Sequence, residues 1–383
     1  MSSKRNYNKY LWFIILIVFS AVIGYYVGKN GATFFSPVPK LVKMWVVILF
    51  VPAFLIVIGI HEAGHALAGV LLKFDFKMYV VGPFMWEKES GGWKFKWNKN
   101  VNTAGGMVIC LPTGTENLAQ RFSIYALGGP VASLVLALAA YFTYRSVTFH
   151  YVDQAIYLGV AKYFCLMLAI FSFLIMVVTI IPLRMGGFSS DGARALQLLS
   201  GGDRSRFEVL LLKIIGSTTS GIRPGLLNVA DVAEAQLLAE RTNAPMGVYV
   251  PGIYHQVEFD GGSMDKAEEQ LIKYIDGANE IPDGVRNAVW VDAAFFYAFG
   301  RQDLDMAMSY WNRFQQSAML AQALVLAAEA SISLLNMDYT RTAEKIAASR
   351  MEIPNMMDKG LGIALTDKLN ELEKRISTIT TSL

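Results

Sequence analysis

The chain has 383 residues, of which 54% are hydrophobic and 17% charged, and its formal net charge is +3. This composition excludes an ordinary soluble protein and predicts a membrane protein with a soluble part attached. The small net charge, without a dense stripe of Lys and Arg, gives no reason to expect nucleic acid as a partner. Cys110 and Cys165 lie in different sequence contexts, so we expect neither a disulfide framework nor a cysteine zinc site.

The first apolar run, residues 10–28, follows Lys4, Arg5 and Lys9. It is long enough to cross a bilayer and no small-residue cleavage site follows it, so we expect an anchor rather than a removed signal peptide. The basic flank predicts a cytoplasmic N-terminus for a multi-pass protein of the cell membrane. Residues 1–43 would thus comprise an anchor and a short external loop.

Residues 44–72 form the predicted second span, which is longer than a simple crossing requires. Pro52 predicts a kink in it. The run carries no charge until His61 and Glu62, with His65 one helical turn further on. Ionisable groups in an apolar span are costly, so their presence indicates a functional site.

Residues 78–98 are typical of a small β-hairpin or sheet, which we place on the cytoplasmic side. Aromatic residues alternate with lysines through Trp93, Phe95 and Trp97, and a Gly-Gly pair supplies the turn. Two interpretations remain open. The segment is either a membrane-surface ribbon with an aromatic belt, or an edge strand on which an extended substrate pairs, with these three aromatic residues as candidate substrate contacts.

Residues 122–144 and 161–182 are the predicted third and fourth spans. The Gly128-Gly129-Pro130 group in the third span is expected to break or thin the helix and to let another backbone approach closely. With four spans and a cytoplasmic N-terminus, the chain after Pro182 and its C-terminus are predicted to be cytoplasmic.

Residues 202–383 are soluble in character and helical in period. Turns that lead to Ala267, Ala307 and Ala343 echo one another, at a spacing close to that of tetratricopeptide-type helix pairs. Such a repeat and an unrelated helical bundle both remain open, and either could bind a protein partner. The aromatic stripe from Trp290 to Phe299 is interpreted as core.

His61 and His65 would share one helix face, where two neutral imidazoles can bind one zinc ion. Glu62 beside them fits a catalytic general base. A catalytic zinc needs a third protein ligand. The two remaining histidines, His150 and His255, are predicted at the wrong membrane depth.

Asp191, just beyond the inner end of the fourth span, is at the right depth and is our predicted third ligand. Its alternative interpretation is the N-cap of a short polar helix ending near Gly201, a role for which Ser190 and Gly192 are also suited.

These motifs resemble the site-2 protease family of intramembrane zinc metalloproteases. The matching residues are the stretch from Gly59 to Ala66, the Gly-Gly-Pro group of the third span, and Pro182 followed by Ser190-Asp191-Gly192. The resemblance implies that His61, His65 and Asp191 bind zinc and that Glu62 is the catalytic carboxylate.

Two departures from the family pattern bear on the substrate and on the loop beside the metal. Thr179 stands where members often have Asn, which leaves a substrate contact at Thr179 as a candidate only. The stretch from Pro182 to Asp191 is longer than in many members, with residues 185–188 inserted.

The expected fold is therefore mainly α. A polytopic domain with four transmembrane helices and a small β-hairpin or sheet, its protease core at 44–200, precedes a helical, tetratricopeptide-like soluble domain at 202–383. The leading hypothesis is a zinc endopeptidase that cleaves transmembrane or membrane-associated peptides within the bilayer near the cytoplasmic face. The alternative is a membrane scaffold or immunity-type protein, with a structural or vestigial metal site and a helical domain that binds a partner.

Overall fold

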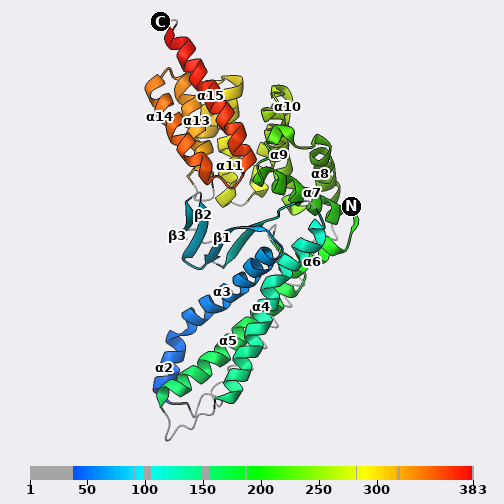
Figure 1. Ribbon diagram of the computed structural model, residues 1–383, viewed down its shortest axis with the longest axis vertical. Coiled ribbons are helices and arrows are strands. Elements are labelled where there is room, and N and C mark those ends of the chain that lie inside the picture. Colours follow the sequence, from blue (N-terminus) through cyan, green and yellow to red (C-terminus); the bar gives the residue numbers. More distant parts are fainter. Residues whose placement is uncertain are drawn as a thin grey trace. The chain divides into compact units, whose positions relative to one another are not determined.

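The computed structural model describes residues 38–381 except 90, 99–104, 115, 148–154, 186–187, 282 and 317–319 (Figure 1). The predicted first span, residues 10–28, lies outside the described residues. Among the described residues, 38–54 with 137–171 form one compact unit, and 55–136 with 172–381 form a second. The domains predicted from the sequence are continuous segments with boundaries near residues 43 and 201, and these boundaries stay a prediction.

Among the described residues, three helices are long and apolar enough to cross a membrane: α3 (Phe50–Leu71), α4 (Leu118–Ser146) and α5 (Ile156–Ile180). Each coincides with one of the predicted spans in the described part of the chain. Many of their large apolar side chains are exposed, among them Leu67, Val135 and Phe173. Apolar helices with such outer surfaces are suited to lipid, and the chain is a membrane protein.

The predicted second span is not one helix, which corrects the sequence interpretation. It consists of α2 (Lys40–Ile48) and α3, with a break at Leu49. The break lies just before Pro52. Proline has no N–H to donate to the carbonyl of Ile48, four residues earlier, and its ring clashes with that carbonyl, so the helix is interrupted there.

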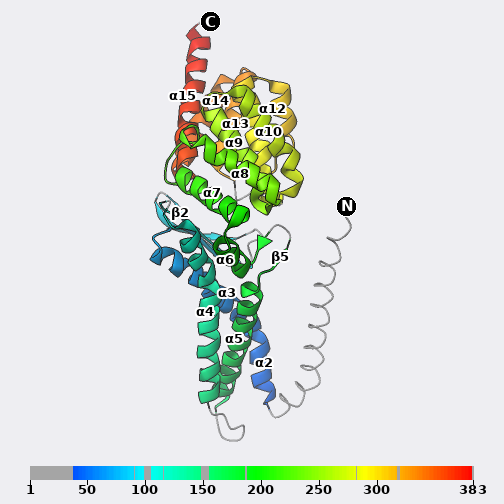
Figure 2. The ribbon, with the colours of Figure 1, turned by 90° about the vertical axis from the view of Figure 1, so that its right-hand side faces the viewer.

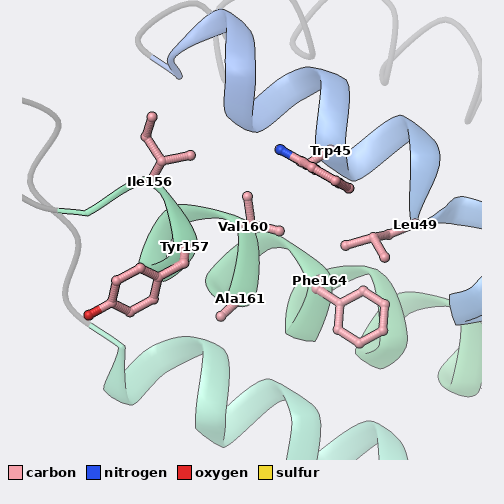
Figure 3. Close-up of a pocket in the computed structure, with 7 residues that line it drawn as sticks. All are labelled: Trp45, Leu49, Ile156, Tyr157, Val160, Ala161 and Phe164. Atoms are coloured by element: carbon pink, nitrogen blue, oxygen red, sulfur yellow. The ribbon is translucent and has the colours of Figure 1, made fainter.

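In the first unit, α2 and Val38 just before it pack against α5 through the buried side chains of Val38, Val42 and Tyr163. The same two helices border an open pocket with an apolar lining (Figure 3), formed by Trp45, Leu49, Ile156, Tyr157, Val160, Ala161 and Phe164. No charged side chain lines this pocket, so its lining suits an apolar occupant.

In the second unit, four antiparallel strands follow α3 in the order β3-β2-β1-β4. Their bounds are β1 (Asp75–Val81), β2 (Phe84–Glu89), β3 (Gly92–Trp97) and β4 (Met107–Leu111). The predicted hairpin or sheet is thus confirmed. The sequence interpretation missed β4, although the glycines at 105 and 106 and the proline at 112 bound its short apolar run.

One face of the sheet is mainly aromatic and the other is charged. Tyr79 pairs with Trp86 and Trp86 with Phe95, so these rings share a face. A register shift between Phe76 and Met78 brings Phe76 onto that face as well, 4.8 Å between ring centroids from Trp93. On the opposite face, ion pairs join lysines to glutamates, namely Lys94–Glu89, Lys96–Glu87 and Lys96–Glu89.

Helix α4 runs through the Gly-Gly-Pro group without a break, contrary to expectation. The expected close approach is present. A Cβ atom added to Gly128 would lie 2.5 Å from the Gly64 carbonyl oxygen, and one added to Gly64 would lie 2.3 Å from that of Gly128. The backbones of α3 and α4 therefore touch directly, as small residues permit between membrane helices.

After α5, a two-stranded hairpin of β5 (Arg184–Met185) and β6 (Phe188–Ser189) precedes α6 (Asp191–Leu199), which leads into α7 (Gly202–Thr219) (Figure 2). A small buried core joins the end of α3, β4, α4 and α6, and its members are Phe74, Cys110, Phe122, Tyr125 and Leu198. This core sets the position of α6 relative to α3 and α4.

The rest of the chain is helical: α7 (Gly202–Thr219), η2 (Pro224–Leu226), α8 (Val229–Thr242), η3 (Pro245–Tyr249), α9 (Val250–Asp260), α10 (Met264–Asp276), η4 (Gly277–Glu280), α11 (Asp283–Phe295), η5 (Phe296–Arg301), α12 (Leu304–Trp311), α13 (Gln322–Leu335), α14 (Tyr339–Glu352), η6 (Ile353–Asn355) and α15 (Lys359–Thr381).

Neighbouring helices in this region pack in pairs, α9 with α10, α11 with α12, and α13 with α14. Ala267, Ala307 and Ala343 lie in the first turns of the second members. The tetratricopeptide-like repeat itself stays a prediction. Phe295, Phe296 and Phe299 are buried in the main core and Trp290 packs against it, which confirms the interpretation of this stripe.

The close contact between α3 and α4 predicts that a methyl group added at Gly128 destabilises the protein. Gly128→Ala should lower the unfolding free energy by about 1–3 kcal/mol, because the methyl group would overlap the backbone of Gly64. Thermal unfolding in detergent measures the change. Gly91→Ala is the matched control, since nothing lies within 4 Å of a Cβ at Gly91. Equal unfolding temperatures for the two variants would contradict the proposed contact.

Candidate metal centre

His61 and His65 lie one turn apart on α3, as their spacing predicts, and their side chains are buried. Their ring centroids are 5.0 Å apart and the ring planes are nearly perpendicular. A Cβ added to Gly129 of α4 would lie 2.7 Å from His61 Nε2 and 2.3 Å from His65 Nε2. The absent side chain of Gly129 thus leaves space in front of both Nε2 atoms.

The other nitrogen of each imidazole is held by α4. His61 Nδ1 lies 2.9 Å from the Ser133 hydroxyl, and His65 Nδ1 lies 2.9 Å from the Tyr125 carbonyl oxygen. A carbonyl only accepts, so His65 carries its proton on Nδ1 and keeps the Nε2 lone pair free. The Gly129 N–H is further from His65 Nδ1, at 3.3 Å, so we assign the tautomer from the shorter contact.

Asp191 is the first residue of α6, and its carboxylate faces the two histidines. Its Oδ2 lies 3.3 Å from His61 Nε2 and 3.5 Å from His65 Nε2. The alternative role, the helix cap, belongs to Ser190, whose Oγ accepts from the Ala193 N–H at 3.2 Å. Burial acts to raise the pKa of Asp191, but the hydrogen bonds and charges of the histidines outweigh it and hold that pKa below its usual value.

These three side chains fit a metal ion. Their ligand atoms all lie within 4.8 Å of one another. Ligands of one tetrahedral zinc at its usual bond lengths are about 3.3–3.5 Å apart, close to the two distances from Asp191 Oδ2. Both histidines present Nε2 while Nδ1 is bound elsewhere, which is the usual arrangement of zinc-ligating imidazoles. The group could therefore hold a metal ion through three protein ligands.

Glu62 is buried on the side of α3 next to the histidines. Its carboxylate lies against the segment that enters β4, because a Cβ at Gly106 would be 2.5 Å from Glu62 Oε1. Tyr79 is also close: burial, with a smaller effect of the Glu62 charge, raises the pKa of Tyr79 to about 12. Glu62 thus sits between the candidate metal ligands and the sheet.

The longer spacing between Pro182 and Asp191 does not disturb the site. The Ser190 hydroxyl donates to the Ile181 carbonyl at 2.7 Å and accepts from the Leu183 N–H at 3.1 Å. The Ser190 N–H also donates to the Leu183 carbonyl at 2.9 Å. The β5–β6 hairpin is therefore closed at its base, and the inserted residues leave Asp191 in place.

The remaining sequence-predicted residues lie elsewhere. Thr179 donates its hydroxyl to the Ile175 carbonyl of its own helix, at 2.9 Å. Trp93, Phe95 and Trp97 are exposed on the aromatic face of the sheet. His255 is buried in the helical region against Phe259 and Phe296, and His150 is outside the described residues.

The sequence interpretation missed the residues that orient the histidines. Ser133 follows Gly129 by four positions, so the two share a helix face, and this spacing is the signal that could have identified Ser133. Tyr125 contributes a main-chain carbonyl and leaves no signal in the sequence.

Two histidines on a membrane-capable helix, a convergent carboxylate and a neighbouring glutamate define a metal-site class typical of zinc hydrolases. Residues 49–206 match the model of Peptidase family M50, the site-2 protease family, and this match confirms the predicted resemblance. The family suggests a membrane metalloprotease. Comparisons with curated proteins and with solved structures found no match.

Replacement of Ser133 is predicted to lower the affinity for the metal ion. Ser133→Ala should weaken zinc binding about 10- to 100-fold, because His61 would lose the partner that fixes its ring. Competition with a zinc chelator in detergent measures this affinity. Ser146→Ala, at an exposed position near the other end of the same helix, should bind zinc like the unchanged protein. Equal affinities for the two variants would rule out an orienting role for Ser133.

Proposed function

We propose that this protein is an intramembrane zinc endopeptidase, which hydrolyses peptide bonds of transmembrane or membrane-associated substrates near the cytoplasmic face of the cell membrane. The observation that carries the proposal is the convergence of Asp191, from the start of α6, with His61, His65 and the neighbouring Glu62 of α3, a helix apolar enough to cross a bilayer. The match to the M50 family over this same segment supports it.

His61 Nε2, His65 Nε2 and an oxygen of Asp191 would hold the zinc ion. When bound, zinc supplies Lewis acidity and lowers the pKa of its water to about 7. Glu62, as general base, accepts a proton from the attacking water on its carboxylate and delivers it to the leaving amine. Ser133 and the Tyr125 carbonyl keep both imidazoles in the required orientation throughout.

The sheet would present the substrate. A helical substrate hides its amides in its own hydrogen bonds, so cleavage requires local unwinding. Strand β3 lies at one edge of the sheet, where an extended peptide could add as a further strand. In that arrangement Trp93, Phe95 and Trp97 would contact substrate or lipid, and Thr179 is a further candidate contact.

The remaining parts of the proposal concern topology and partners. The basic residues before the apolar run 10–28 support a cytoplasmic N-terminus, and with four spans the C-terminus lies on the same side. The paired helices from α9 to α14 resemble partner-binding helical repeats, so we propose a protein partner for this region.

Substitution of the glutamate separates catalysis from metal binding. Glu62→Gln should abolish cleavage of membrane substrates, by at least about 10²-fold, and should leave about one zinc per chain, because the three ligands are untouched. Mass spectrometry of an added membrane protein mixture and elemental analysis of the purified protein measure the two quantities. Glu269→Gln, an exposed change beside Lys273, is the matched control.

His65→Ala should remove both zinc and cleavage, since it deletes a ligand. Cleavage that persists in Glu62→Gln would refute the mechanism. A metal-free protein whose cellular function survives His65→Ala would instead favour the scaffold alternative.

A further inference from the structure

A second cavity lies where the sheet meets α3. Its volume is about 360 Å³, and Ala63, Ala66, Phe76, Tyr79, Trp86 and Trp93 line it. This volume is within the range of pockets that hold small organic groups, roughly 300–1,000 Å³. Two alanines from the helix and four aromatic side chains from three strands thus line an open pocket.

The cavity depends on the irregularity in β1. In a regular strand, Phe76 and Tyr79 would point to opposite faces because they are three positions apart. The register shift between Phe76 and Met78 turns both rings to the same side, with their centroids 6.5 Å apart. Bulges of this kind re-aim side chains next to active sites, and here the bulge completes an aromatic wall.

The cavity adjoins the proposed catalytic carboxylate. Glu62 and Ala66 are four residues apart, and Glu62 and Ala63 are adjacent, so all three lie on neighbouring parts of one helix surface. The separation of one helical turn, about 5.4 Å, is shorter than the spacing of about 6.8 Å between alternate residues of an extended peptide. A peptide bond held at Glu62 can therefore have a nearby side chain in the cavity.

The lining selects against charge. The only side-chain polar groups are the Tyr79 hydroxyl and the two indole N–H groups, and the hydroxyl already donates to the Gly59 carbonyl at 2.5 Å. A charged side chain would find no opposite charge among the six lining residues. Aromatic rings pack favourably edge-to-face with other rings, and Trp86 and Trp93 are only partly covered.

We infer that this cavity is a specificity pocket, which takes a large apolar side chain, preferably aromatic, within two residues of the scissile bond. The inference rests on the proposed peptidase function and extends it to the substrate class. Ala63 and Ala66 form the floor of the pocket, and Trp93 forms its outer wall. Preferred substrates carry Phe, Trp or Leu beside the cleaved bond, and a charged residue there prevents cleavage.

The test uses synthetic peptides in detergent, each with about 20 apolar residues and a central Asn-Pro break. In each peptide, one position near the break carries Ala, Phe, Trp or Asp. Mass spectrometry then identifies the cleaved bonds. The zinc-loaded full chain should cut the Phe and Trp peptides with a kcat/KM at least about tenfold above that of the Ala peptides. Asp peptides should remain uncut at the same positions.

Two variants should lower the ratio of the Phe to the Ala rate. Ala66→Leu fills the pocket and should bring the ratio near one, with zinc content reporting on folding. Trp93→Ala removes the outer wall and should lower the same ratio. Trp45→Ala is the matched control, because Trp45 has a similar exposure, 43% against 47% for Trp93, and lines the other pocket. Its ratio should stay unchanged.

Photo-crosslinking separates this inference from the peptidase proposal. A peptide carrying benzoylphenylalanine should label the pocket residues of Glu62→Gln, and this labelling should disappear in the Glu62→Gln, Ala66→Leu double variant. Cleavage without preference near the cut bond, or labelling elsewhere on the protein, would overturn the pocket while the peptidase proposal stands. If no peptide is cut, the peptidase proposal fails, and the crosslink alone decides whether the cavity binds aromatic side chains.

Discussion

The direct contact between the backbones of α3 and α4 is the constraint on which the site depends. Because Gly64 and Gly128 have no side chains, α4 comes close enough for Ser133 and the Tyr125 carbonyl to reach the histidines of α3. The same approach places Gly129 in front of both Nε2 atoms, where any side chain would occupy the position of a metal ion. Helix packing and site construction are thus one arrangement.

The ionisable groups of the site lie in a strongly apolar part of the chain, where an ionisable side chain without a partner costs free energy. The structure offsets this cost by pairing. Asp191 faces both imidazoles, and each imidazole has a hydrogen-bond partner on α4. A bound cation would complete this balance, since it would add positive charge between the carboxylate and two neutral rings.

Local sequence patterns were sufficient for the long helices, the hairpin and the shared helix face of the two histidines, because apolar run length and helical spacing act locally. Asp191 was predicted instead from the membrane depth that the order of the spans gives it. The position of the helix break could not be predicted, because Pro52 indicates a distortion of the helix but not the residue, Leu49, at which the helix is interrupted. The unbroken course of α4 and the strand β4 depended on packing that no short pattern encodes. The aromatic wall was hidden for a similar reason, since the register shift at Phe76 reverses the alternation from which a strand face is read.

The closure of the β5–β6 hairpin by Ser190 has a consequence for the variation of this protein. The hydroxyl and main-chain N–H of Ser190 tie the two ends of the segment together, so the position of Asp191 is set at the base of the hairpin rather than by its length. A change in the number of residues between Met185 and Phe188 should therefore leave the Asp191 carboxylate in place. For the same reason, an epitope or a fluorescent label inserted between Met185 and Phe188 should not displace Asp191.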